Sequence, residues 1–181
     1  MTYYGGKELA QSFRTVRGNT IQIAQEIPED KYGFSPAPGT RTVAQTLAHV
    51  ARGPFFQMYT HTNKIDDLKK VNFPALMAEN AAEEAKPRGK AELIAFLQTE
   101  GEKYATWVET LPEGFLAERV AMPPGANPDS KSRFEMLLSP KEHEKHHRAQ
   151  LMTVLRMLGQ TPHLTRQFQE RMAQAQAAAK K

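Results

Sequence analysis

Apolar residues recur at three- and four-residue steps along most of this chain, whereas the two-residue alternation typical of strands never lasts. The clearest apolar stripe predicts a first helix from about Lys7 to Ile27, ending before Pro28. Its members are Leu9, Phe13, Val16, Thr20, Ile23 and Ile27. A helix with such a stripe must bury it against other elements, so the pattern favours an all-α protein.

Segments rich in proline and glycine separate this helix from the next ones. After the loop IPEDKYGFSPAPGT, Thr42 and Gln45 have the spacing of a capping box, which predicts a second helix that fades between Tyr59 and Asn63. A third helix is expected at Lys90–Thr110. The connection over residues 64–87 is long, and we expect a short helix in it at Phe73–Glu84.

In the last third of the chain, the helical pattern is interrupted more often. Ser132 is the expected cap of a short helical piece that ends at Leu138. Ser139 and Pro140 then predict the restart of a fourth helix, with serine as N-cap and proline at the first helical position. This helix runs to about Leu158, where Gly159 closes it, and a last helix is expected at Leu164–Ala178.

Four helices of this length bury their stripes in a four-helix bundle, and the long connections favour at least one crossover. We expect one domain over residues 1–181, with a core at about 7–160 and a short helical C-terminal extension at 161–181. The chain of 181 residues is long enough to bury a sizeable core without disulfides.

Composition narrows the classes of function. The chain has no cysteine, which excludes disulfides, thiolate metal sites and a cysteine nucleophile. Its formal net charge of +4 comes from scattered basic residues with no basic helix face, so nucleic acid is not an expected partner. No secretory leader and no membrane-spanning run is recognisable, and the expected location is the cytoplasm.

Histidines are the main candidates for chemistry. The stretch KEHEKHHRAQL, residues 141–151, holds three of the six histidines. His143 and His147 are four residues apart and lie on the helix face that continues through Leu151, so they point toward the core. His146 falls on a more polar row to one side.

Two imidazoles on one helix face can share a metal ion, or they can be a polar flank or a satisfied core pair. A metal site needs a third ligand, which His49 in the second helix can supply. His61 and His163 are expected at the surface or as capping residues. No side chain stands out as a general acid or base, and structural roles are favoured for Glu142 and Arg148.

Two blocks resemble the DinB/YfiT-like family. SPAPGTRTVAQTLAHVA is similar to the segment that leads into the family's second helix, and KEHEKHHRAQLMTVLRMLG is similar to its last bundle helix. The resemblance extends over about residues 7–160, although Ala149 stands where the family often has glycine. It implies a four-helix bundle with a long crossover, often a homodimer, and one divalent metal held by three histidines. Carried over by position, the ligands are His49, His143 and His147.

Three histidine ligands leave coordination positions open, which is typical of catalytic rather than structural sites. The resemblance to thiol transferases and related enzymes implies a metal-dependent enzyme, either a low-molecular-weight-thiol S-transferase or a hydrolase. The expected metal is zinc or nickel, with iron as a third choice. The expected partners are a small-molecule substrate and a thiol cosubstrate. The alternative is a non-catalytic, stress-related metal-binding dimer or interaction protein.

Overall fold

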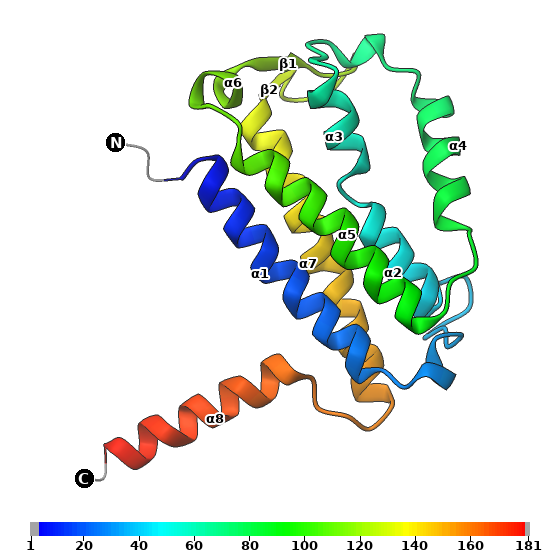
Figure 1. The fold of residues 1–181 in the computed structure, drawn as a ribbon, viewed down its shortest axis with the longest axis vertical. Coiled ribbons are helices and arrows are strands. Elements are labelled where there is room, and N and C mark those ends of the chain that lie inside the picture. Colours follow the sequence, from blue (N-terminus) through cyan, green and yellow to red (C-terminus); the bar gives the residue numbers. More distant parts are fainter. Residues whose placement is uncertain (1–3, 180–181) are drawn as a thin grey trace.

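The computed structural model describes residues 4–179, and most of them are helical (Figure 1). The bundle helices are α1 (Gly6–Glu26), α2 (Val43–Arg52), α5 (Lys90–Glu109) and α7 (Arg133–Met157). The other α-helices are α3 (Phe55–Thr62), α4 (Phe73–Glu84), α6 (Glu113–Ala117) and α8 (His163–Ala178). Two 3-10 turns lie at Glu29–Lys31 and Leu68–Lys70. No helix within the described range is both long and apolar enough to cross a membrane.

The bundle topology places α1 diagonally across from α2, and α5 diagonally across from α7. Helix α1 packs against α5 and α7, and α2 packs against the same two helices. The chain therefore crosses the bundle between α1 and α2. The second long connection, from α3 to α5, carries α4 along the outside of α2 (Figure 1). The predicted all-α bundle with a crossover is confirmed, and so is the short helix at Phe73–Glu84.

The core between the four helices is apolar at both ends. One cluster joins all four helices through Ile23, Leu47, Leu97, Leu151 and Leu155. A second cluster joins α1, α5 and α7 through Leu9, Phe13, Tyr104, Val108 and Leu137. These side chains are almost fully buried. Burial of each contributes on the order of 1.5–3 kcal/mol before the entropy of ordering is subtracted.

A buried arginine connects the four helices midway along the bundle. Arg17 of α1 donates from Nε to both carboxylate oxygens of Glu144 in α7, at 2.9 Å. Its Nη1 donates to the Leu97 carbonyl of α5, and its Nη2 to the Val50 carbonyl of α2 at 3.1 Å. A Cβ at Gly101 would lie only 2.9 Å from the Arg17 side chain, so glycine leaves the room for it.

The second predicted helix differs from expectation because it is divided. Helix α2 ends at Arg52, and α3 begins at Phe55 after Pro54. Proline has no amide hydrogen to donate to the carbonyl four residues earlier, which is that of Val50. That carbonyl accepts instead from the amide of Gly53 and from Arg17. The predicted capping box at the start of α2 is confirmed, with reciprocal bonds between Thr42 and Gln45 of 2.9 and 3.2 Å.

The predicted restart at Ser139 and Pro140 is wrong, because α7 continues through Pro140 without a break. The predicted cap at Ser132 is confirmed, since its hydroxyl accepts from the Glu135 amide at 3.1 Å. Buried residues on both sides of the proline, such as Leu137 and Leu151, hold the helix against the core. Packing therefore outweighs the one hydrogen bond that proline removes.

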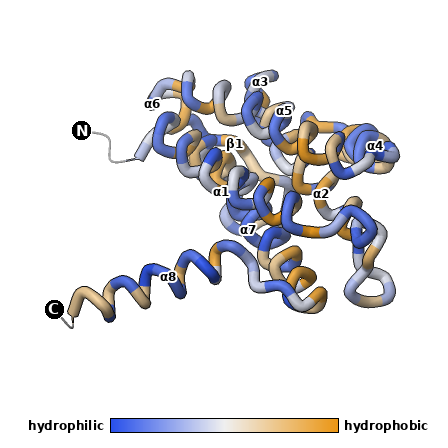
Figure 2. Tube along the Cα trace, turned by 60° about the horizontal axis from the view of Figure 1, so that its bottom comes forward, coloured by the Kyte–Doolittle hydropathy of each residue, from blue (hydrophilic) through white to orange (hydrophobic). Residues whose placement is uncertain are grey.

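The ends of the chain and one hairpin complete the fold. Gly159 has a φ of +79° and ends α7 as predicted. Helix α8 then stands away from the bundle in both views (Figures 1 and 2).

Strands β1 (Arg119–Ala121) and β2 (Ser130–Ser132) pair antiparallel, with Val120 opposite Lys131. The sequence did not predict this hairpin, because three residues are too few to display alternation.

Candidate metal centre

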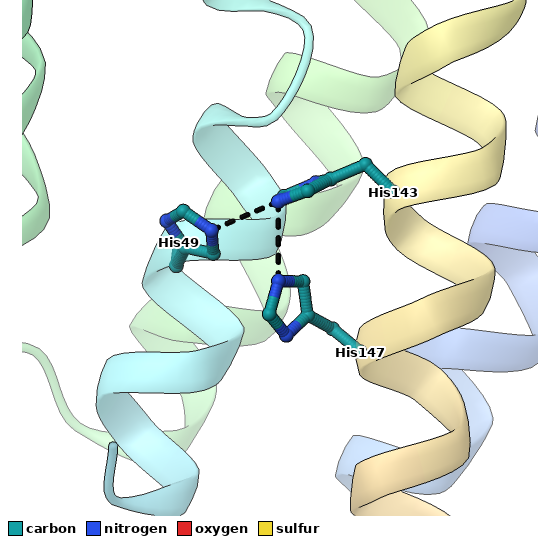
Figure 3. A group of neighbouring side chains, drawn as sticks. All are labelled: His49, His143 and His147. Carbon is teal, nitrogen blue, oxygen red and sulfur yellow. Dashed lines mark hydrogen bonds between the residues drawn. The ribbon is translucent and has the colours of Figure 1, made fainter. Parts of the chain in front are cut away.

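Three imidazoles meet between α2 and α7 (Figure 3). His49 lies in α2, and His143 and His147 lie one turn apart on α7, as the helical spacing predicts. The Nε2 atom of His143 is 2.8 Å from Nε2 of His49 and 3.1 Å from Nε2 of His147. The structure thus brings the three predicted residues together through the same ring nitrogen of each.

The outer nitrogens of two rings have acceptors. Nδ1 of His49 lies 3.0 and 3.1 Å from the two carboxylate oxygens of Glu84, at the end of α4. Nδ1 of His147 lies 2.8 Å from Oε1 of Gln150. A neutral imidazole that donates from Nδ1 has a lone pair at Nε2. Glu84 and Gln150 therefore hold His49 and His147 in the tautomer whose lone pair faces the centre of the group.

The third ring is held by close packing. Nδ1 of His143 is buried and has no hydrogen-bond partner within the described residues. Beside it is Gly53, where a Cβ would lie 2.9 Å from that nitrogen. Any larger residue would displace the ring, so glycine at the end of α2 sets how close the two helices come at the site.

The local environment keeps the two imidazoles of α7 neutral. Burial lowers the pKa of His143 to about 4, and its histidine neighbours add to the effect. Burial likewise lowers the pKa of His147, although the hydrogen bond that this ring donates to Gln150 acts in the opposite direction. Near pH 7 these rings carry no proton charge that would repel a cation.

A cation fits this arrangement. With His49 and His147 donating outward, at most one proton lies among the three Nε2 atoms, of which that of His143 is 2.8 and 3.1 Å from the other two. Zinc–nitrogen bonds of about 2.0–2.1 Å in tetrahedral geometry would place the nitrogens about 3.3 Å apart. The observed separations of 2.8 and 3.1 Å need only a few tenths of an ångström of outward motion. That these residues ligate a metal stays a prediction.

The remaining histidines take other positions. His146 is exposed, as predicted, and its Nε2 is 3.2 Å from Nε2 of Gln150. The predicted surface positions of His61 and His163 are wrong, since each is only 1% exposed. His61 contacts Gln57 and Arg133, and His163 contacts Asn19. Tertiary contacts bury these two rings, and nothing in their sequence neighbourhood signals that.

Three residues that shape the site, namely Gly53, Glu84 and Arg17, were not predicted from the sequence. Glu84 closes the predicted short helix, but only the docking of α4 on α2 brings its carboxylate to His49. Arg17 binds the carbonyl of Val50 and the carboxylate of Glu144, each the neighbour in sequence of one of the three histidines. Glu142 is exposed and does not reach the group.

Two recesses open on either side of the three histidines. The larger one has a volume of about 790 Å³ and lies between the loop before α2 and the middle of α7, with His147 in its wall. The smaller one has a volume of about 190 Å³, and its wall contains His49, His143 and Glu84. The larger volume is in the range of sites that bind small molecules.

Comparison with known proteins agrees with this description. A DinB-like protein, YjoA from Bacillus subtilis, has a TM-score of 0.63 at 18% identity, over 85% of this chain and 94% of its own. YfiT from Bacillus subtilis, described as a probable metal-dependent hydrolase with an unusual four-helix bundle topology, has a TM-score of 0.66 at 14% identity, over 89% of this chain and 91% of its own. A search among curated proteins gave no match. The sequence model of the DinB family matches residues 1–178, and the chain therefore belongs to the DinB family.

Proposed function

We propose that this protein is a divalent-metal-dependent hydrolase whose metal is held by His49, His143 and His147. The observation that carries the proposal is the convergence of three Nε2 atoms: that of His143 lies 2.8 Å from that of His49 and 3.1 Å from that of His147, and outer hydrogen bonds fix the lone pairs of His49 and His147 inward. A cation between the rings would use all three nitrogens as ligands. The description of YfiT as a probable metal-dependent hydrolase supports the same reaction class.

The chain's own groups define how such a site would work. A divalent cation bound by three neutral imidazoles would keep open positions, polarise a substrate carbonyl or phosphoryl oxygen and make water more acidic. Glu84 would raise the basicity of His49 and hold its ring in place. The Arg17–Glu144 pair would fix the spacing of α2 and α7, on which the three-ligand geometry depends.

Zinc or nickel is the metal that we propose, with iron next. All three ions accept imidazole nitrogen, and the ligand set contains no thiolate that would favour softer metals. Elemental analysis of untagged protein identifies the metal directly.

A thiol S-transferase is the second candidate. The family resemblance implies it, and the larger recess, at about 790 Å³, has room for an electrophile and a small thiol together. In this reaction the sulfur of a thiol would replace water as the nucleophile at the same site.

The test combines metal content with turnover. Wild-type protein without a polyhistidine tag is expected to hold near-stoichiometric metal, and His147→Ala is expected to lose it. Ester and phosphoester hydrolysis should require the metal and return when metal is added back to chelated protein. Turnover of a generic electrophile only with an added thiol would identify the transferase. Bound metal without either activity would favour the non-catalytic metal-binding protein, and absence of metal would end the proposal.

We also propose a homodimer. Helix α8 stands away from the bundle, and two of its large apolar residues are solvent-accessible, Phe168 at 57% and Met172 at 46%. A second copy covering this face would bury them. Light scattering on wild-type protein and on a Phe168→Glu, Met172→Glu variant is expected to give a dimer and a monomer, respectively, and a monomeric wild type would contradict the proposal.

A further inference from the structure

The charged side chain that lines the larger recess beside His147 is positive, and no negative one accompanies it among the described residues. Arg41 lines it, together with the imidazoles of His146 and His147. No aspartate or glutamate is among its lining residues in the described part of the chain. The remaining lining side chains are apolar or polar without charge, among them Val43, Leu151, Thr46 and Gln150. The recess thus combines one permanent positive charge with walls that are partly apolar.

Hydrogen bonds hold the backbone of Arg41 on both sides. Before it, the Ser35 hydroxyl is 2.8 Å from the hydroxyl of Thr40, which itself donates to the Ala37 carbonyl at 2.7 Å. Gly39, with a φ of +78°, provides the left-handed turn of this loop. Directly after Arg41, the capping box at Thr42 begins α2. The loop therefore presents Arg41 from a fixed position.

The guanidinium of Arg41 has no carboxylate partner within residues 4–179, since no hydrogen bond or ion pair forms to it there. By contrast, Arg14, Arg17 and Arg133 are each paired with glutamate.

The smaller recess has a different charge pattern. Its wall contains the carboxylate of Glu84, and its arginine, Arg52, lies 3.6 Å from Glu100 and donates to Asn80. An anion entering from that side would meet a carboxylate and an arginine that is already paired. The larger recess is therefore the side of the three histidines that suits a negative ligand.

We propose that the larger recess binds an organic anion, a small molecule with a carboxylate or phosphate-type group, which Arg41 holds while the apolar walls contact the rest. Guanidinium binds both groups in the same two-point geometry. This inference rests on the proposed function, because it names the class of substrate that would be presented to the metal. Arg41 is in this sense a specificity-determining residue.

The test measures binding of three fluorinated probes of similar size by ligand-observed fluorine NMR on metal-loaded protein. These are 4-fluorobenzoate, 4-fluorobenzylphosphonate and the neutral 4-fluorobenzamide. At least one anion is expected to bind about tenfold more tightly than the amide. Arg41→Gln should abolish this preference and leave amide binding unchanged. Arg171→Gln, which removes the charge of an exposed arginine on α8, should keep it.

The two anions separate carboxylate from phosphate-type substrates by their relative affinity. The inference is wrong if neither anion binds more tightly than the amide, including the case in which no probe binds. It is also wrong if Arg41→Gln keeps the full preference, since the cation at the histidines would then be the anion receptor. Metal content is measured on the same samples and tests the proposed hydrolase separately. Protein without metal would contradict the hydrolase, but it could still prefer anions through Arg41.

Discussion

Two histidine clusters, one fully buried and one partly buried, differ in where their nitrogens point. His61 is 1% exposed, yet both its nitrogens are satisfied: Nε2 by Gln57 at 3.1 Å and Nδ1 by the guanidinium of Arg133 at 3.0 Å. In the three-histidine group, Nδ1 of His143 has no partner in the described part of the chain, and its Nε2 faces two other Nε2 atoms. Burial lowers the pKa of His61 and of His143 to about 4 alike.

The comparison shows that burial and a lowered pKa do not by themselves identify a functional histidine. The His61 cluster pairs donors with acceptors and needs nothing further, so its role is structural. The other group points three Nε2 atoms at one another and leaves Nδ1 of His143 without a partner in the described residues, an arrangement that a cation among the three Nε2 atoms fits. Substitutions in the two clusters should therefore have opposite consequences for stability and for metal binding.

The largest expected effect is that of His143→Ala on activity. Loss of one of three ligands should reduce metal content to background and metal-dependent turnover by more than about a hundredfold. The metal-free variant should be no less stable than metal-free wild type, because it removes a buried nitrogen that lacks a partner. Elemental analysis and denaturant unfolding check both parts, and retention of metal would contradict the ligand role.

Arg133→Met should have the reverse pattern. It removes the donor to Nδ1 of His61, to the Ile65 carbonyl and to Glu118. Arg133 is 2% exposed, so its hydrogen-bond partners would stay buried without a donor. The free energy of unfolding should therefore decrease by about 3 kcal/mol. Metal content per folded protein should stay at the wild-type level. A variant that loses metal while its unfolding midpoint is unchanged would mean that the two clusters are coupled.

Acidification should affect the His61 cluster through proton linkage. Burial, with the Arg133 charge, lowers the pKa of His61 to about 4 in the folded chain, whereas the unfolded value is about 6.5. Between these two pH values the unfolded chain binds a proton that the folded chain does not. The contribution of neutral His61 to the free energy of unfolding is therefore complete above about pH 6.5 and decreases as the pH falls toward about 4. The loss should be about 2 kcal/mol at pH 5.

The measurement is the free energy of unfolding of metal-free protein at about pH 7.5 and about pH 5, for wild type and His61→Asn. We expect the variant to be less stable than wild type at both pH values. Its free energy of unfolding should decrease less on acidification, by the same amount of about 2 kcal/mol. Equal decreases in both proteins would show that His61 is not the group that takes up the proton.

The smallest expected effect is that of Glu84→Ala on metal affinity. Loss of the carboxylate that fixes the His49 tautomer should weaken metal binding about tenfold, in a competition titration with a chelator. Glu79→Ala, on the same helix and exposed, is the matched control and should bind metal as wild type does. If both variants match wild type, the hydrogen bond that His49 donates to Glu84 does not affect metal affinity.

Much of the fold followed from local patterns. The apolar stripes predicted α1 and α5 to within about a residue or two, and the spacing of Thr42 and Gln45 predicted the start of α2. Pro28 follows the end of α1 as predicted, but two other prolines contradict the prediction in opposite directions. Pro54 divides a helix that the stripe predicted as continuous, and Pro140 lies inside one that was predicted to restart.

The sequence by itself determined the helical class and the face shared by His143 and His147, because residues four apart on a helix adopt that relation whatever surrounds them. Only the tertiary structure brought His49 to that face, Glu84 to His49 and Arg41 to the adjoining recess. It also decided that His61 is buried and satisfied. These relations depend on which helices pack together, and packing is decided by the sum of many weak contacts across the bundle rather than by the spacing of any few residues.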